Sequence, residues 1–297
     1  MDINWWERHI VDLSPYYQFQ ENSIHLLDLS KVHPIISGNK FYKLYGYLKQ
    51  YEISKFKGMV SMGSAHSNHL HALSFYCFLH NIPFYAFVRK FDNENLKFTP
   101  TLIDIKEWNT NIIPLSAHDY RKLRKEERWT EFLNVNNELL WIPEGGRGEM
   151  ADLGIRKILK PIIKNYKQIW INVGSAASLA AIFQIEDLQQ QEFFGVAPFK
   201  KIKEQEGYLI KKNVHNYNFK LFKNPWNINF GQITDEVYDF VEKMEQKLPV
   251  RLDYIYTSSL FKVFEDFILE KQIVNKKLPI LLIHGGGLQG NRTYERS

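Results

Sequence analysis

Short apolar runs alternate with longer amphipathic segments along most of the chain. Residues 57–89, KGMVSMGSAHSNHLHALSFYCFLHNIPFYAFVR, place an apolar run, a turn of small residues and a helix-length stretch before a second apolar run. This order is typical of a strand, a helix and a further strand. The same order of apolar run and helix-length stretch begins again at NTNIIPL, at ELLWIPEGG and at YKQIWINVG. The last apolar run is LPILLIHGGG. The alternation predicts mostly parallel sheets with helices on both faces.

Two segments keep the helical spacing of apolar residues over a clear stretch, residues 155–163 and 237–248. Thr234 and Asp235 precede the second segment, and either could cap its first turn. The pattern fails at residues 211–229, which are rich in Asn and aromatic residues. We expect a loop or an edge element there.

The composition is that of a globular protein with a large core. The chain has 297 residues, 44% hydrophobic and 15% aromatic, which suits one large domain or two smaller ones. Its 38 basic and 33 acidic residues are spread along the sequence, and the basic runs at 121–129 and 200–212 interleave Glu with Lys and Arg. Such runs are typical of solvated helix faces or loops. We therefore expect no nucleic-acid partner.

Cysteine content and the N-terminal segment bear on the cellular compartment. Cys77 is the only cysteine, which excludes an intrachain disulfide and a multi-cysteine metal site. The N-terminal segment carries Asp2 and Glu7, and no apolar run in it is long enough for a signal peptide or a membrane span. We expect a cytoplasmic protein without a membrane partner.

Four loops rich in small polar residues are candidate ligand sites. In doubly wound sheets, ligands bind at the carboxyl ends of the strands, where helices begin. The loops are SGNK (37–40), GSAHSNH (63–69), VGSAAS (173–178) and IHGGG (283–287). Their composition lets a flat ligand or a phosphate approach backbone N–H groups. Two have a second interpretation: a serine of VGSAAS would cap an ordinary helix, and IHGGG would be a simple glycine turn.

Three closely spaced histidines, His66, His69 and His71, raise the question of a zinc site. His69 and His71 are two residues apart and diverge if the helix has begun by then. No HExxH pattern or neighbouring carboxylate supports ligation. We expect no metal.

Lys40 directly follows the turn-forming Ser-Gly-Asn, and Lys43 comes three residues later. Most lysines are solvated surface residues, but an amine is also the group that forms a Schiff base with an aldehyde cofactor. A buried or electropositive setting lowers the pKa of such an amine towards the reactive neutral form, and Lys43 would supply a neighbouring charge. Lys43 is also suited to bind a phosphate.

Five segments together resemble one enzyme family: HPIISGNKFYKL, GSAHSNH, PEGG, DYIYT and IHGGGLQG. Their order and approximate spacing, over about residues 25–290, are similar to those of pyridoxal-phosphate enzymes of the 1-aminocyclopropane-1-carboxylate deaminase and D-cysteine desulfhydrase family. The resemblance implies an α/β architecture with two open-twisted, mostly parallel-sheet domains of the tryptophan-synthase-β-like class (fold type II). It also implies pyridoxal 5'-phosphate as the cofactor, a small amino acid as the substrate and a homodimer.

The resemblance also implies how the chain is divided. Residues 1–42 and 146–297 would form a larger cofactor-binding domain, and residues 43–145 a smaller inserted α/β domain. The cofactor would lie in the cleft between the two domains.

The same resemblance implies roles for the residues that hold the cofactor. Lys40 would bind the cofactor through its amine and shuttle a proton, while Lys43 would contact the cofactor phosphate. That phosphate would also be bound by the backbone of Gly174, Ser175, Ala176, Ala177 and Ser178. Relatives usually carry glycine where Ala176 and Ala177 stand, and alanine fits there when its φ angle is negative.

Other motif residues would face the substrate. Ser67 and Asn68 match the pair near the substrate carboxylate and the phenolic oxygen of the cofactor, and Ser67 would also be catalytic. His69 and Gly285 would line the substrate pocket. Tyr256 would act as a nearby acid, base or orienting hydroxyl.

Thr257 stands where the family places the partner of the cofactor's pyridine nitrogen, and its chemical type bears on the reaction. A carboxylate keeps that nitrogen protonated and makes the ring a strong electron sink, whereas a hydroxyl hydrogen-bonds a neutral ring. Ring-opening deaminases of the family carry Glu here, and desulfhydrase-like members carry Thr or Ser. The sequence therefore favours a D-cysteine desulfhydrase-like β-elimination that gives a 2-oxo acid and ammonia. The alternatives are 1-aminocyclopropane-1-carboxylate deaminase activity and a catalytically lapsed homologue with a binding role.

Overall fold

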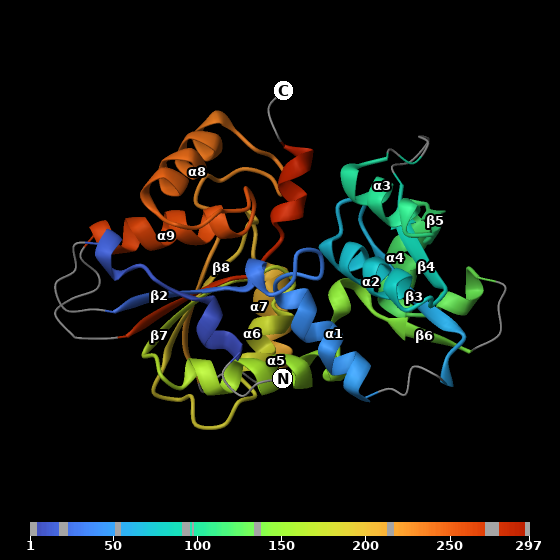
Figure 1. Cartoon of the computed structure of the whole chain (residues 1–297), viewed down its shortest axis with the longest axis horizontal. Helices are drawn as coiled ribbons and strands as arrows, with labels where there is room; N and C mark the ends of the chain where they lie inside the picture. The colour runs from blue at the N-terminus through green and yellow to red at the C-terminus, as the bar shows by residue number, and fades with distance from the viewer. Residues whose placement is uncertain are drawn as a thin grey trace. The chain divides into compact units, whose positions relative to one another are not determined.

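The computed structural model describes residues 5–17, 23–50, 55–90, 96, 98–133, 138–212, 217–270 and 279–294. The strands are β1 Ile10–Asp12, β2 Ile24–Asp28, β3 Gly58–Gly63, β4 Phe84–Arg89, β5 Asn111–Leu115, β6 Leu139–Ile142, β7 Gln168–Asn172, β8 Glu192–Val196, β9 Asn218–Phe222 and β10 Ile280–His284. The α-helices are α1 Asn39–Gln50, α2 Asn68–Leu79, α3 Pro100–Glu107, α4 Ala117–Glu126, α5 Glu149–Ile163, α6 Ala177–Ile182, α7 Lys203–Lys211, α8 Asp235–Lys247 and α9 Thr257–Leu269. The alternation of strands and helices confirms the predicted α/β class (Figure 1).

The chain divides into two compact units. The first unit comprises Met1–Val32 and Ile155–Tyr294, and the second comprises His33–Gly154. The sequence places the domain boundaries after residues 42 and 145 instead. The two divisions differ at residues 33–42 and 146–154, which belong to the second unit in the structure. Ile36 and Ala151, from these two segments, pack into the hydrophobic core of that unit.

A six-stranded sheet with the order β1-β2-β10-β7-β8-β9 forms the centre of the first unit, and only the β1–β2 pair in it is antiparallel. Helices α8 and α9 lie on one face of this sheet, and α5 and α6 lie on the other (Figure 1). Trp170 is fully buried under α9, with its ring centroid 4.4 Å from that of Phe194 and 5.1 Å from that of Phe264. Aromatic packing therefore fixes α9, whose first residue is Thr257, against the middle of the sheet.

The second unit is built on a four-stranded parallel sheet with the order β5-β4-β3-β6. Successive residues of its strands face opposite sides, as the pleat requires. Met59 of β3 packs in the core with α1, α2 and α3, whereas Val60 packs on the other side with Leu123 of α4. Both faces are thus covered, and this explains why the strands are continuous apolar runs.

Three local predictions can be compared with the structure. The segment 155–163 lies in α5 and buries its apolar face, and part of 211–229 forms β9 at the edge of the first sheet, as predicted. Residues 213–216 lie outside the described residues. Thr234 does occupy the N-cap position of α8, but its side chain makes no capping hydrogen bond.

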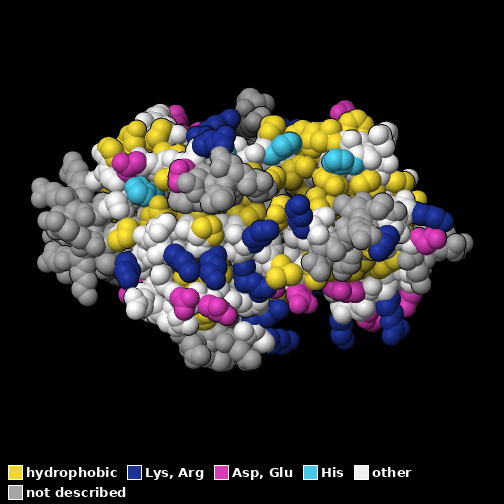
Figure 2. Space-filling view, turned by 60° about the horizontal axis from the view of Figure 1, so that its bottom comes forward, with side chains coloured by type: hydrophobic (Ala, Val, Ile, Leu, Met, Phe, Trp, Pro, Cys, Tyr) yellow, Lys and Arg dark blue, Asp and Glu magenta, His cyan; other side chains and the backbone are white. Residues whose placement is uncertain are grey.

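No α-helix among the described residues combines the length and the hydropathy that crossing a membrane demands. Figure 2 shows Lys and Arg side chains on the same face as Asp and Glu side chains. This mixture agrees with the interleaved charges of the sequence.

Helices α1 and α5 cross at two glycines, Gly46 and Gly154. A Cβ atom added to Gly46 would lie 1.9 Å from the carbonyl oxygen of Met150, and one added to Gly154 would lie 2.2 Å from the carbonyl oxygen of Tyr42. The two backbones are therefore closer than any other residue type allows. This contact fixes α1, which carries Lys40 and Lys43.

We expect Gly46→Ala to lower the free energy of unfolding by about 3 kcal/mol, because the added methyl group forces the two helices apart. Chemical denaturation followed by circular dichroism measures the change. Gly207→Ala on α7 is the matched control, since an added Cβ there meets nothing within 4 Å. The control should be neutral or more stable by about 0.5 kcal/mol. Equal stability of the two variants would contradict the close crossing.

Candidate active site

Lys40 lies in the first turn of α1, immediately after a sharp change of chain direction. Gly38 has a φ angle of 67°, a conformation that glycine adopts without strain, and α1 begins at Asn39. The Lys40 amine is half-buried and donates a hydrogen bond to Oδ1 of Asn39 at 2.8 Å. Burial lowers the pKa of Lys40 to about 8. About a tenth of this amine is therefore neutral and nucleophilic at pH 7, far more than for an ordinary lysine.

Lys43 lies one turn further along α1 and is almost completely buried. Its Nζ donates to the carbonyl oxygen of Gly145 at 2.9 Å. Burial, followed by the charge of Lys40, holds the pKa of Lys43 well below its usual value, and Asp152 opposes this effect. Of the two causes that the sequence suggests for a lowered pKa of Lys40, a buried setting and a neighbouring charge, burial is the larger.

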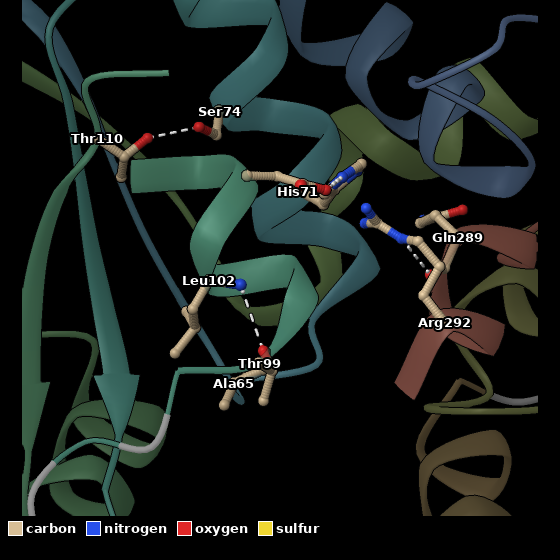
Figure 3. Close-up of polar contacts among 9 residues, drawn as sticks. Ala65, His71, Ser74, Thr99, Leu102, Thr110, Gln289 and Arg292 are labelled. Carbon is tan, nitrogen blue, oxygen red and sulfur yellow. Dashed lines mark hydrogen bonds and ion pairs between the residues drawn. The ribbon is translucent and has the colours of Figure 1, made fainter. Parts of the chain in front are cut away.

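The loop between β3 and α2 carries Ser67 and Asn68, both half-buried at the start of α2. Ser67 is the N-cap, and its Oγ accepts a hydrogen bond from the amide of Leu70 at 3.2 Å. The loop is also held from outside, because the Thr99 hydroxyl at the cap of α3 donates to the carbonyl oxygen of Ala65 (Figure 3). Hydrogen bonds at Ala65 and at Ser67 therefore hold the loop that precedes α2.

His69 is buried, and its hydrogen bonds determine its tautomer. The Ser61 hydroxyl donates to the carbonyl oxygen of Ile142 at 2.6 Å, so His69 Nε2, at 2.9 Å from Ser61 Oγ, must carry the proton. Burial and the charges of Lys40 and Lys43 hold the pKa of His69 well below its usual value. The neutral ring leaves Nδ1 without a hydrogen-bond partner among the described residues.

The turn in the PEGG segment contacts both Lys43 and His69. Gly145 and Gly146 have φ angles of 70° and 63°. Gly145 accepts the hydrogen bond from Lys43, and a Cβ added to Gly146 would lie 3.1 Å from His69 Nδ1. The second unit therefore brings Lys40, Lys43, His69 and this turn together.

The three histidines of the HSNHLH segment do not converge. His66 is exposed, His69 faces Ser61, and His71 Nε2 lies 2.7 Å from Oδ2 of Asp104 on α3. Figure 3 shows His71 on α2, next to α3. Within the described ranges, no group of three His, Cys, Asp or Glu residues could hold a metal ion.

In the first unit, the loop after β7 contains Gly174, Ser175, Ala176, Ala177 and Ser178. Ala176 is the N-cap of α6 with φ 61° and ψ −1°, and no serine caps this helix. The condition of a negative φ, under which alanine fits without strain, is therefore not met at Ala176. The Gln205 amide donates to the carbonyl oxygen of Gly174 at 3.1 Å, which fixes the peptide preceding Ser175. The first amides of a helix have no partner inside it and favour an anion.

Asp253 organises the turn that precedes α9. Its carboxylate accepts hydrogen bonds from the amides of Ile255, Tyr256 and Thr257, at 3.2, 2.6 and 2.9 Å. It also accepts from the Thr257 hydroxyl at 2.5 Å. Burial, followed by the nearby Asp253, raises the pKa of Tyr256, so that its hydroxyl stays protonated. The Tyr256 ring lies beside Gly174, where an added Cβ would be 3.4 Å from its Cε1.

Thr257 also lies next to the loop after β10. Its Oγ1 is 3.1 Å from Nδ1 of His284 and 3.5 Å from Nδ2 of Asn172. A Cβ added to Gly285 would meet only Nδ2 of Asn172, at 3.8 Å, so there is room beside Gly285. The first unit therefore groups the predicted residues Gly174, Tyr256, Thr257 and Gly285.

Sequence reasoning missed several supporting residues. Asp253 precedes Thr257 by four residues and had a detectable signal, because Asp side chains commonly accept hydrogen bonds from the backbone amides that follow them in a turn. Gln205, Ser61 and His284 had no such signal, since each is brought to its partner by tertiary packing alone.

No family model matches the chain. A curated relative from Pyrococcus furiosus, named "Putative 1-aminocyclopropane-1-carboxylate deaminase", is 26% identical over 281 residues, which cover 87% of this chain and 83% of the relative. A crystal structure of an ACC deaminase homologue matches with a TM-score of 0.78 at 21% identity, covering 95% and 90% of the two chains. Threonine deaminase isoform 2 from Solanum lycopersicum matches with a TM-score of 0.66 at 11% identity, covering 94% and 78%.

These comparisons confirm the resemblance predicted from the five sequence segments. They also confirm the tryptophan-synthase-β-like fold class and the prediction of an enzyme. The roles of individual residues stay predictions.

Replacing Ala176 by glycine tests the backbone conformation of the loop after β7. We expect Ala176→Gly to raise the free energy of unfolding by about 0.5 kcal/mol, because glycine relieves the left-handed conformation at some entropic cost. Ala180→Gly, inside α6, should lower it by about 1 kcal/mol. Thermal unfolding of both variants measures the difference. If Ala176→Gly is destabilised as much as Ala180→Gly, the assigned conformation of Ala176 is wrong.

Proposed function

We propose, from the confirmed resemblance to 1-aminocyclopropane-1-carboxylate deaminase homologues, that this chain is a pyridoxal-phosphate-dependent lyase or deaminase of small amino acids. The observation that carries the proposal is the state of Lys40. Its amine is half-buried, its pKa is lowered to about 8, and it lies in the HPIISGNKFYKL segment, one of those that resemble the family. A surface lysine would have none of these properties.

The residues present fit this cofactor. Lys40 offers a reactive amine, and the loop from Gly174 to Ser178 offers backbone amides for a phosphate. In addition, the buried Oδ1 atom of Asn172 has no hydrogen-bond partner among the residues described, so it can accept a hydrogen bond from a ligand. When bound, pyridoxal phosphate supplies an electron-withdrawing ring that stabilises negative charge on the substrate α-carbon.

Each residue would contribute a defined step. Lys40 would hold the cofactor through its amine, and the same amine would carry the substrate α-proton. Ser67 and Asn68, at the start of α2, would bind the substrate carboxylate through a hydroxyl, an amide and the positive end of the helix. Tyr256, kept protonated by burial, would donate a hydrogen bond or a proton to the leaving group.

Two substrates remain candidates for this site. Thr257 in place of Glu supports D-cysteine, with β-elimination of sulfide. The name of the relative from Pyrococcus furiosus supports 1-aminocyclopropane-1-carboxylate, with ring opening. Both routes end in a 2-oxo acid and ammonia. The resemblance also leads us to propose a homodimer.

Lys40→Ala should abolish both the shift in the absorbance spectrum that accompanies attachment of the cofactor and the release of a 2-oxo acid, because it removes the amine that binds the aldehyde. The measurement is a titration of the purified protein with pyridoxal phosphate, followed by D-cysteine or 1-aminocyclopropane-1-carboxylate. Lys49→Ala, on the same helix but exposed, is the matched control and should behave as wild type. Full activity of Lys40→Ala would contradict the proposal. Normal cofactor binding by wild type without turnover of any small amino acid would favour a lapsed homologue.

The lowered pKa of Lys40 predicts how cofactor attachment depends on pH. Only the neutral amine attacks an aldehyde, so the rate should fall about tenfold per pH unit below pH 8 and level off above it. Stopped-flow absorbance after mixing apoprotein with pyridoxal phosphate measures this profile. A rate that keeps rising to pH 10, as for an ordinary lysine, would show that burial does not activate Lys40.

A further inference from the structure

The proton of the Thr257 hydroxyl is already committed inside the protein. Thr257 is fully buried, and its Oγ1 lies 2.5 Å from Oδ2 of Asp253. Asp253 is itself buried and accepts three backbone amides besides this hydroxyl. An acceptor-only carboxylate with four donors gives the Thr257 proton a charge-assisted hydrogen bond, which is about twice as strong as a neutral one.

His284 cannot reverse the direction of this hydrogen bond. The amide of Gly286 donates to His284 Nδ1 at 3.0 Å, so Nδ1 is an acceptor. His284 Nε2 lies 3.0 Å from the carbonyl oxygen of Arg251, which has no proton to give, so Nε2 carries the proton. His284 Nδ1, 3.1 Å from Thr257 Oγ1, can therefore only compete with Asp253 for the hydroxyl proton. With either acceptor, Thr257 keeps lone pairs and no proton for a further partner.

We propose that Thr257, with its proton held by Asp253, acts as a hydrogen-bond acceptor toward the pyridine nitrogen of the cofactor and thereby keeps that nitrogen protonated. This inference rests on the proposed function. A neutral pyridine nitrogen would face another acceptor, whereas a protonated one donates to Thr257 Oγ1 with the negative charge of Asp253 behind it. Asp253 is then a positioning residue that transmits the effect of a carboxylate through a hydroxyl.

The hydrogen bond between Thr257 and Asp253 also bears on which substrate the site suits. From its type alone, threonine implies a neutral ring and favours β-elimination. In the network with Asp253, the same side chain supports a protonated ring, the stronger electron sink. A stronger sink suits reactions that place more negative charge on the cofactor, such as opening of a strained ring in 1-aminocyclopropane-1-carboxylate. With the Asp253–Thr257 pair, a threonine at this position no longer argues against 1-aminocyclopropane-1-carboxylate as the substrate.

Nitrogen NMR of holoenzyme loaded with pyridoxal phosphate carrying ¹⁵N in its ring tests this directly. We expect the wild-type signal at the position of a pyridinium reference compound. Thr257→Val removes the acceptor but leaves the three amide hydrogen bonds of Asp253, and its signal should move to the position of a neutral pyridine. Asp253→Asn should shift it in the same direction. Ser259→Ala, which removes a hydroxyl of the same helix bonded to the Ile255 carbonyl, should leave the signal unchanged.

Thermal unfolding of each loaded variant checks that it is folded. A wild-type signal at the neutral position would overturn the inference while leaving the proposed function intact. A pyridinium signal that persists in Thr257→Val would overturn the assignment of the effect to Thr257 and Asp253. Failure of the wild-type protein to bind the labelled cofactor would overturn the proposed function, and the inference with it.

Discussion

Parallel pairing of neighbouring strands is the constraint on which the candidate site depends. In the second unit, β3 and β6 are parallel neighbours, so the loop with Ser67 and the turn at Gly145 leave the same edge of the sheet. In the first unit, β10 and β7 are parallel neighbours, and Gly285 and Gly174 follow them in the same way. Segments far apart in sequence thus meet because their strands end together. Any register shift would separate the groups that the chemistry needs.

Exclusion of water sets the chemical state of the candidate groups within each unit. It lowers the pKa values of Lys40, Lys43 and His69, and raises that of Tyr256. Each shift favours the neutral form, as burial in a poorly polarisable setting must. A neutral amine at Lys40 is the form that attacks an aldehyde, and a protonated phenol at Tyr256 is the form that donates a proton.

Much of this could be predicted from the sequence, because the signals are local. Alternation of apolar and amphipathic segments gives the strands and helices, and loops of small residues give the ligand edges. Lys40 stands out through the turn before it. Ala176 could not be interpreted from its type, because tertiary packing holds it in a conformation that alanine disfavours. Likewise, the assignment of residues 33–42 to the second unit depends on tertiary packing, and the direction of the Thr257 hydrogen bond depends on Asp253 and His284.

Lys40 is the residue that we propose binds pyridoxal phosphate. Reduction of the loaded protein with borohydride makes the linkage permanent, and peptide mass spectrometry then locates it. We expect a single major adduct on Lys40, with Lys43 and the exposed lysines unmodified. An adduct spread over surface lysines, or its absence from Lys40, would contradict the role proposed for Lys40.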